Sequence, residues 1–419
     1  MKIIADLHLH SKYSRATSKE MDVPNLCHWA KIKGIDIIAT GDFCHPQYLK
    51  ELKQELVSNG KGLFTHKKDK SKNPTHFILS NEVSCIYKKG DKTRRLHICL
   101  FAPSLEAVEK LSNTLDKKGF NIKSDGRPIF GLDVRDLTEM VLDIDEKFMV
   151  VPAHIWTPWF ALFGSKSGFD TIEECFEDMT PNIYAAETGL SSDPEMNWRL
   201  SALDNITLIS NGDSHSPAKL GREANVFELQ DYSYDEIYNL IKEKDRRKFL
   251  YTIEFYPQEG KYHWDGHAKC KISFSPQDTK KNKGICPVCK KPLVLGVDYR
   301  VDELADRPLG FKPENAIPYK SLVPLQEIIA ECFQVRSATK KVKNSYDNLI
   351  KKFGSEFKIL LDISVEDLKK ENELLAEAVQ RVREGKVHVE PGYDGVFGIV
   401  QIFNKKEIKK FIPQQEKLL

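Results

Sequence analysis

The sequence has 419 residues, of which 41% are apolar and 30% charged, and its net charge at pH 7 is +2. This length allows two or three domains, and the near-neutral charge restricts any nucleic-acid binding to local basic patches. No apolar run is long enough to cross a membrane, and the first residues do not resemble a signal peptide. We therefore expect a cytoplasmic protein with no membrane partner.

The first motif follows the first predicted strand. An apolar run at residues 3–5 leads into the sequence Asp-Leu-His-Leu-His, which places His8 and His10 two residues apart. Residues two apart in a strand point to the same side, so these two imidazoles can bind one metal ion. The alternative is a pair of half-buried histidines on an alternating strand.

Seven apolar runs alternate with helix-like segments over the first 255 residues, which predicts successive βα units and a parallel sheet or barrel. Each run carries or ends in a His, Asp or Glu, and the active sites of such barrels lie at the strand C-termini. Mixed His and carboxylate ligands suit Zn²⁺, Mn²⁺ or Fe²⁺, and two ions that share a carboxylate typically hydrolyse phosphate esters. An amidohydrolase is the competing interpretation, but no lysine stands at a strand end. The runs cover residues 3–5, 34–40, 76–82, 96–101, 148–154, 183–187 and 206–215.

Segments between the runs supply further candidates. Apolar spacing predicts helices over residues 23–33 and 105–118, and the basic loops at residues 60–73 and 88–95 are either solvated or contact phosphates. Trp156 and Trp159 could stack on a base or wedge a duplex, or they could pack under a long loop. Asp193 lies in a Ser-Ser-Asp-Pro loop after a predicted strand. It is a candidate general acid or base, and otherwise a turn residue.

Residues 256–300 have a different character, with two ligand pairs close together. Cys286-Pro-Val-Cys289 is typical of a zinc knuckle, and His267 and Cys270 have the same two-residue gap. Four protein ligands would close a tetrahedral Zn²⁺ site, which indicates a structural rather than a catalytic role. A redox Cys-x-x-Cys pair is the alternative, but such pairs open a helix after a strand.

The remainder, residues 301–419, is predicted to be mainly helical, with helical spacing over residues 322–333 and 365–384. Lys340 and Lys341 are candidate DNA contacts there. Residues 414–419 are typical of a flexible tail, although a glutamine and two leucines could also dock on a sliding clamp. We therefore predict three domains: a barrel at residues 1–255, a zinc-binding module at 256–300 and a helical DNA-binding domain at 301–419.

The strand-end motifs resemble the PHP (polymerase and histidinol phosphatase) family. The resemblance implies an α/β fold, a distorted seven-stranded barrel, and a three-metal centre for phosphoester hydrolysis in which Glu82 and Asp213 are catalytic. In that family an Asp-His pair often ends the second strand, whereas Phe43 follows Asp42 here. The implied ligands are His8, His10, Glu82 and Asp213 for one ion, Glu82, His97 and His154 for the second, and His215 with Asp42 or His45 for the third.

Longer motifs are similar to the endonuclease Q family: residues 185–194, residues 197–204, the predicted zinc unit, and the turn at residues 391–395. The resemblance implies nicking of double- or single-stranded DNA 5′ to deaminated bases (uracil, hypoxanthine, xanthine) and abasic sites, with Zn²⁺, Mn²⁺ or Mg²⁺ at the catalytic centre. More than a third of the chain lies outside the barrel, which suits gripping a duplex, and reading a damaged base requires extruding it. The alternatives are a small-molecule phosphoesterase of the histidinol-phosphatase type and a DNA-binding module with a degenerate barrel.

Overall fold

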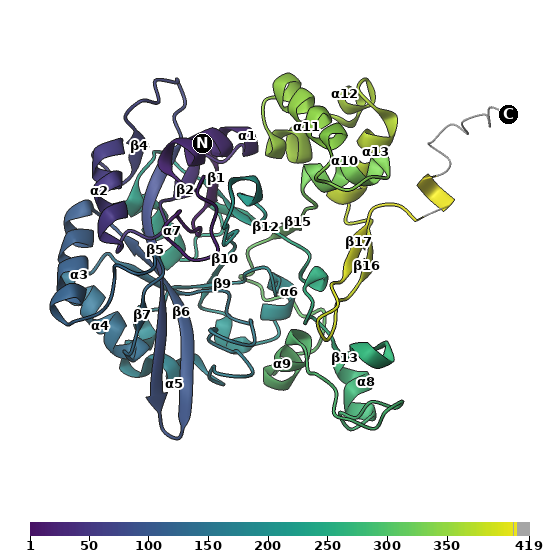
Figure 1. The fold of residues 1–419 in the computed structure, drawn as a ribbon, viewed down its shortest axis with the longest axis horizontal. Coiled ribbons are helices and arrows are strands. Elements are labelled where there is room, and N and C mark those ends of the chain that lie inside the picture. The colour runs from purple at the N-terminus through teal and green to yellow at the C-terminus, as the bar shows by residue number, and fades with distance from the viewer. Residues whose placement is uncertain (405, 409–419) are drawn as a thin grey trace.

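A mixed α/β fold surrounds one main sheet, and the computed structural model describes residues 1–404 and 406–408 (Figure 1). The predicted clamp-binding peptide, residues 414–419, lies outside the described residues. The eleven strands of the main sheet are β1 (Lys2–Asp6), β2 (Ile37–Ala39), β3 (Leu56–Ser58), β4 (Phe64–His66), β5 (His76–Lys89), β6 (Lys92–Ala102), β7 (Ile129–Phe130), β8 (Met149–Pro152), β11 (Ala224–Glu228), β12 (Phe249–Glu254) and β15 (Tyr319–Ser321). Their order is β15-β12-β11-β1-β2-β5-β4-β3, with β6 and β7 also paired to β5, and β8 paired to β6.

All seven apolar runs contain strands, so the α/β prediction is confirmed. The last two runs supply β9 (Ala185–Glu187) and β10 (Thr207–Ile209), which form a separate parallel pair. The expectation of parallel strands throughout is wrong for β6, which is antiparallel to both β5 and β8. Only Gly90 and Asp91 separate β5 from β6, and a connection this short makes a hairpin and cannot contain a crossover helix.

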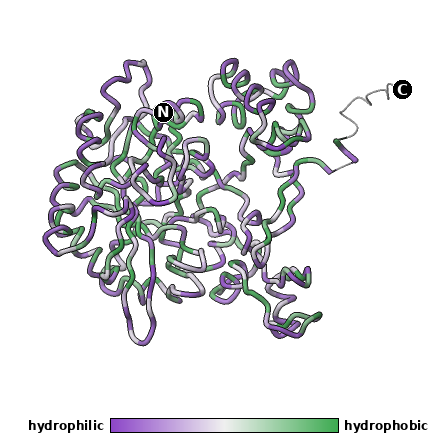
Figure 2. The backbone as a smooth tube through the Cα atoms, in the orientation of Figure 1, coloured by the Kyte–Doolittle hydropathy of each residue, from purple (hydrophilic) through white to green (hydrophobic). Residues whose placement is uncertain are grey.

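The β5–β6 hairpin projects from the body of the molecule (Figure 1). The strand β5 has 14 residues and continues well past Glu82, so that the basic segment at residues 88–95 forms the far end of the hairpin. Figure 2 shows that this end is hydrophilic. Glu82 therefore lies inside a long strand, opposite Cys99 on β6, and not at a strand end.

Helices cover the outside of the sheet: α1 (Val23–Lys33), α2 (Pro46–Glu55), α3 (Leu105–Lys117), α4 (Val134–Ile144) and α7 (Tyr234–Lys242). The predicted helix at residues 23–33 is confirmed, because Asp22 accepts a hydrogen bond from the Asn25 N–H at its start and Gly34, with φ 84°, ends it. The prediction for residues 105–118 is confirmed to within one residue. No helix in the described part of the chain is both long enough and apolar enough to span a bilayer.

A compact helical unit follows residue 324 and packs on α1. It contains α10 (Leu325–Phe333), α11 (Lys340–Phe353), α12 (Val365–Lys369) and α13 (Glu373–Arg383). The predicted helix at residues 365–384 is interrupted, because Asn372 accepts a hydrogen bond from the Leu375 N–H and starts a new helix. Buried Lys33 at the end of α1 donates to Glu356 at 2.6 Å, and Tyr346 donates to the same carboxylate at 2.6 Å. This buried network fixes the helical unit against the sheet-covering helices.

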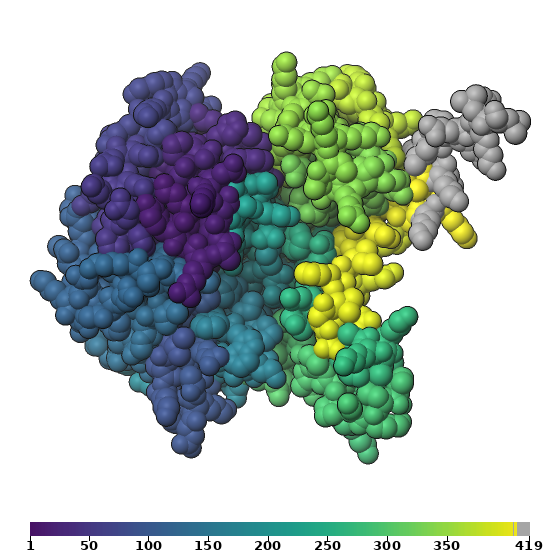
Figure 3. Space-filling model, viewed as in Figure 1, coloured from purple at the N-terminus to yellow at the C-terminus, as the bar shows by residue number. Residues whose placement is uncertain are grey.

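Along the chain, a small module lies between β12 of the main sheet and the helical unit. It contains β13 (Asp265–His267), β14 (Ile272–Phe274), α8 (Pro276–Lys281) and α9 (Val297–Leu304). The chain then returns to the main sheet, where β15 pairs with β12 in parallel. A late hairpin, β16 (His388–Glu390) and β17 (Ile399–Gln401), runs from the helical unit to the module, and its turn pairs Tyr393 with Trp264. Figure 3 shows the module and the end of the β5–β6 hairpin as two projections with an indentation between them. The division into three domains at residues 255 and 300 stays a prediction.

Candidate metal centre

Four side chains from three segments of the chain, which follow or lie in β1, β5 and β10, converge on one small volume. The segment after β1 lies beside the segment after β10, because the His10 N–H donates to the Ser214 carbonyl at 3.0 Å. This contact brings His8 and His10 next to Asp213, and Glu82 reaches them from β5. The ligand atoms of His8, His10, Glu82 and Asp213 all lie within 4.8 Å of one another.

This group fits a metal ion. His8 Nε2, His10 Nε2 and Asp213 Oδ1 are buried and have no hydrogen-bond partner among the described residues, although they face one another. The separation between His10 Nε2 and Asp213 Oδ1 is 3.1 Å, and that between His8 Nε2 and Asp213 Oδ1 is 3.7 Å. Buried polar atoms that converge without partners carry a large desolvation cost, which a shared cation would offset.

A second group shares Glu82 with the first. His97 Nδ1 lies 2.8 Å and His154 Nε2 lies 3.0 Å from Glu82 Oε1, whereas His10 Nε2 lies 3.1 Å from Oε2 of the same carboxylate. The two oxygens of Glu82 therefore face two different groups of histidines. This is the arrangement of a carboxylate that bridges two ions. The structure thus brings together all six of the residues that were predicted for the first two ions.

The electrostatics of the two groups differ. Burial alone would raise the pKa of Glu82, but the surrounding histidines, His97 foremost, hold it well below the ordinary value. Burial lowers the pKa of His97 to about 4, against the opposing pull of Glu82. A neutral imidazole and an ionised carboxylate are the forms that bind metals, so Glu82 and His97 are in the required protonation state at neutral pH. In the first group, burial would lower the pKa of His10, but its contacts with Asp213, Asp42 and Glu82 raise it well above the ordinary value, so a metal ion has to displace a proton there.

Glu187, at the end of β9, orients two of the histidines. Its carboxylate lies 2.9 Å from His8 Nδ1 and accepts a hydrogen bond from the His154 N–H at 2.8 Å. A carboxylate behind a ligating histidine fixes the tautomer and raises the basicity of the other ring nitrogen. The sequence places Glu187 at the end of a predicted strand but does not indicate a role for it.

The structure corrects the roles predicted for Asp42 and His45. Asp42 Oδ2 accepts hydrogen bonds from the Ser11 N–H at 2.7 Å and the Ser14 hydroxyl at 2.9 Å, while Oδ1 lies 3.3 Å from His10 Nδ1. Asp42 therefore positions His10 and belongs to neither converging group of ligand atoms among the described residues. His45 caps α2 through Nδ1, and its Nε2 lies 3.1 Å from the Lys123 carbonyl oxygen, so both ring nitrogens are engaged.

His215 lies at the edge of the first group. Its ring centroid is 4.5 Å from that of His10, and its Nδ1 lies 2.9 Å from the Asp213 carbonyl oxygen. It does not belong to either converging group of ligand atoms in the described residues. A third ion at His215 stays a prediction, now without Asp42 or His45 as its partners.

Replacing Gly126 by alanine should weaken metal binding through Asp42. A Cβ at Gly126 would lie 2.3 Å from Asp42 Oδ2 and 2.6 Å from Ser14 Oγ, so the carboxylate that orients His10 must move. Loss of such an orienting contact typically lowers metal affinity by about 10–100-fold. Calorimetric titration with Mn²⁺ measures the effect. Gly131→Ala is the control, because the nearest atom to its Cβ is 4.0 Å away, and equal affinities for the two variants would contradict the prediction.

The remaining predicted site residues lie in different surroundings. Asp193 accepts a hydrogen bond from the Met196 N–H at 2.9 Å and caps α6 (Pro194–Asn197), which is the turn role; its catalytic role stays a prediction. Of the two roles predicted for Trp156, the structure favours packing under the loop. Its side chain is 1% exposed and donates to Asn197 at 2.7 Å, so the indole is not available to stack on a base.

Exposed aromatic and basic side chains are available for DNA. Trp159 is 50% exposed, and the Arg95 guanidinium lies 5.1 Å from its ring centroid. Thr157 links this loop to the metal centre, because its hydroxyl lies 3.1 Å from His154 Nδ1 and donates to the Trp159 carbonyl oxygen at 2.9 Å. Lys340 and Lys341 are exposed at the start of α11. Their contacts with DNA stay predictions.

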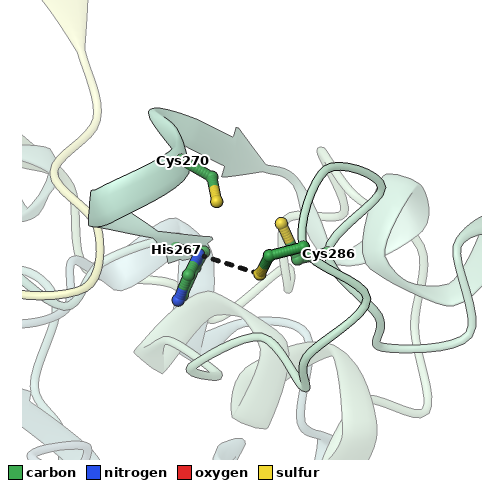
Figure 4. A group of neighbouring side chains, drawn as sticks. His267, Cys270 and Cys286 are labelled. Carbon is green, nitrogen blue, oxygen red and sulfur yellow. Dashed lines mark hydrogen bonds between the residues drawn. The ribbon is translucent and has the colours of Figure 1, made fainter.

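The second candidate site lies in the small module. Figure 4 shows His267, Cys270 and Cys286 directed toward a common space, and the ligand atoms of these residues and Cys289 lie within 4.8 Å of one another. Burial alone would raise the pKa of the Cys286 thiol, but the N–H groups of Cys289 and Val288 lower it below the ordinary value. Three sulfurs and one imidazole match a closed zinc site; the metal itself stays a prediction.

Behind the metal centre, the buried carboxyl of Glu254 should make stability depend on pH. Burial, with Asp193 nearby, raises the pKa of Glu254 from 4.5 to about 8. Between these values the folded chain keeps a proton that the unfolded chain releases, so stability should fall as pH rises, by up to about 1.4 kcal/mol per pH unit. In Glu254→Gln this slope should be smaller in urea unfolding at pH 5.5, 6.5 and 7.5. The exposed Glu106→Gln should retain it, and equal slopes in both variants would count against the assignment.

Comparison with known proteins finds relatives of this chain in both sequence and structure. Residues 324–386 match the family described as the MJ0043 C-terminal domain. The uncharacterized protein MJ0043 of Methanocaldococcus jannaschii is 31% identical over 289 residues, which are 66% of this chain but 34% of that protein, so the match spans about a third of that relative.

Two solved structures are similar over nearly the full length. The lesion-specific endonuclease PfuEndoQ from Pyrococcus furiosus is 32% identical with a TM-score of 0.85, and the comparison covers 98% of this chain and all of that one. Endonuclease Q in complex with a 27-mer duplex that has an abasic lesion at the active site is 33% identical with a TM-score of 0.84, covering 99% and 100% of the two chains. On this likeness in sequence and fold, the chain belongs to the endonuclease Q family.

Proposed function

We propose that this chain is a metal-dependent DNA repair endonuclease that nicks the backbone 5′ to a damaged nucleotide. The observation that carries the proposal is Glu82, whose two oxygens face two separate histidine groups. The family relative whose structure includes an abasic duplex supports DNA as the substrate. DNA cleavage is therefore the hydrolytic reaction that this centre supports best.

The reaction adds water across one P–O bond of the backbone. When bound, Zn²⁺, Mn²⁺ or Mg²⁺ ions would lower the pKa of the attacking water and supply positive charge to the phosphate oxygens. Of the chain's own residues, Glu82 would hold both ions together, and Glu187 would keep His8 in the tautomer that presents Nε2. Burial of the ligands excludes bulk water from their far side.

We further infer that uracil, hypoxanthine and xanthine, as well as abasic sites, direct the nick. A base inside a duplex cannot reach a buried centre, so it must be extruded, at a cost that is lowest for a weakly paired or missing base. Trp159 is suited to stack in the vacated space, because it is half exposed and linked to His154 through Thr157. Lys340 and Lys341 would contact the duplex phosphates farther away.

The finer architecture also belongs to this proposal. The strands β1, β2, β5, β6, β8, β9 and β10 follow one another in chain order around the metal centre, which supports a distorted seven-stranded barrel. The break between β8 and β9 is crossed by a hydrogen bond from the Ile155 N–H to the Glu187 carbonyl at 3.1 Å. The small module would hold a structural Zn²⁺ beside this barrel.

The test is incubation with duplexes that each contain one abasic site, uracil or hypoxanthine, in Mn²⁺, Mg²⁺ or Zn²⁺, followed by a denaturing gel. We expect a single nick in the damaged strand and none in the undamaged duplex. Turnover of small phosphate monoesters without any nick would indicate the histidinol-phosphatase alternative instead. Binding of the damaged duplex with neither reaction, in all three metals, would indicate a DNA-binding module.

A further inference from the structure

Arg127 is a charged residue at the metal centre that the sequence analysis did not identify. It lies between Gly126, which packs against Asp42, and β7, which pairs with β5. Its Nη1 donates to Glu82 Oε2 at 3.0 Å, and its side chain is 28% exposed. The guanidinium thus contacts the bridging carboxylate on one side and solvent on the other.

Arg127 contacts the oxygen of Glu82 that faces the first ligand group. His10 Nε2 lies 3.1 Å from the same Oε2. Arginine stays protonated in proteins and cannot itself be a metal ligand. When Oε2 binds an ion, the charge of that ion repels the guanidinium and weakens its contact with Glu82, while Arg127 retains a positive charge beside the centre.

The guanidinium also has donors to spare. Within residues 1–404 and 406–408, Nη1 is the side-chain nitrogen of Arg127 that has a hydrogen-bond partner, which leaves Nε and Nη2 able to donate. A planar guanidinium with two adjacent free N–H groups matches a phosphate with two non-bridging oxygens.

We propose that Arg127 binds a non-bridging oxygen of the scissile phosphate, in exchange for the Glu82 contact seen here. This inference rests on the proposed endonuclease function. The positive charge would orient the phosphate over the two ligand groups and stabilise the extra negative charge that develops on its oxygens as water attacks. Arg127 would thus be a catalytic residue that contacts the substrate and not a metal ligand.

The competing explanation is that Arg127 only neutralises Glu82 when no metal is bound. Both explanations predict that Arg127→Gln changes metal affinity, so metal affinity does not separate them. They differ on the scissile phosphate itself, because only the proposal requires Arg127 to recognise the charge on that group. A duplex with an abasic site and a neutral methylphosphonate at the scissile linkage removes this charge and leaves the rest of the DNA unchanged.

The experiment measures binding of the full-length protein to the phosphate and methylphosphonate duplexes by fluorescence anisotropy in Ca²⁺, over a time in which a gel shows no nicking. For the wild type, we expect the methylphosphonate to weaken binding by about tenfold or more, as expected when a charge-assisted contact is lost. For Arg127→Gln, the methylphosphonate should weaken binding by a clearly smaller factor than in the wild type, because only the contribution of the metal ions to phosphate binding then remains. In Mn²⁺, this variant should also nick the ordinary abasic duplex about 100-fold more slowly, and Arg127→Lys should recover part of the rate.

Arg247→Gln is the matched control, because Arg247 pairs with Asp245 on an exposed turn far along the chain. It should keep both the wild-type rate and the wild-type preference for the phosphate duplex. If Arg127→Gln retained that preference and nicked at the wild-type rate in saturating Mn²⁺, the inference would be overturned and the charge-neutralising role established. Absence of nicking by the wild type would instead count against the proposed function.

Discussion

Asp213→Asn should lower the rate of nicking by at least about three orders of magnitude while leaving the fold intact. Asp213 has a positive φ of 43°, a conformation that asparagine tolerates well, so the backbone should not change. The substitution removes the negative charge of an unpartnered buried oxygen that faces His8 and His10. A metal contributes several kcal/mol to such a reaction, and about 1.4 kcal/mol corresponds to a tenfold change in rate.

Three measurements define this result. Single-turnover nicking of an abasic duplex in Mn²⁺ should fall, the thermal transition without added metal should stay close to that of the wild type, and affinity for the abasic duplex should be largely retained. Asp231→Asn is the control, because Asp231 forms an exposed ion pair with Lys61. If Asp213→Asn nicked the abasic duplex at the wild-type rate when the metal concentration is limiting, Asp213 would not be a metal ligand.

Cys286→Ser should release the metal from the small module and unfold that module locally. Cys286 is fully buried, and a serine hydroxyl is a much poorer zinc ligand than a thiolate. The two strands of this module have three residues each, so metal binding, which is worth about 10 kcal/mol or more in small zinc domains, would dominate its stability. DNA affinity should fall with it, because the module is one of the two projections on the same side of the molecule (Figure 3).

Zinc content by mass spectrometry should fall by one ion per chain, and limited proteolysis should cut within residues 265–300 of the variant. Cys27→Ser, at a buried cysteine on α1, controls for loss of a thiol elsewhere. Unchanged zinc content together with unchanged DNA binding would mean that these four residues do not form a structural zinc site.

The gathering of ligand-type side chains could be predicted from the pattern of strands, because His8 and His10 alternate after a strand and each remaining ligand accompanies its own apolar run. The resemblance to the PHP family, and not the spacing, implied which of these residues share an ion. The errors arose where hydrogen bonding decides the role. The sequence shows that Asp42 and His45 have ligand chemistry, but it does not show that serine and backbone groups already contact Asp42 Oδ2 and both ring nitrogens of His45.

Residues at longer range were harder to identify. Arg127 is an isolated basic residue in a loop, and only the close packing of Gly126 on Asp42 places it at the centre. Trp156 and Trp159 are three residues apart with opposite exposure, because the tight turn after His154 buries one ring and presents the other. Periodicity does not predict such a turn. The antiparallel direction of β6 was not predicted for a related reason, because a two-residue hairpin connection interrupts the alternation of strands and helices.

The pairing of β15 with β12 determines how the small module is attached. Thr252 is opposite Tyr319, so the chain leaves the main sheet near Glu254 and rejoins the same edge about sixty residues later. The module is thus an insertion whose two stems are held together by sheet hydrogen bonds. If the metal were lost, the intervening chain would become a long closed loop, and lengthening a loop costs little free energy. The main sheet and the helical unit would then remain joined, so that removal of the metal by chelation should be reversible when zinc is restored.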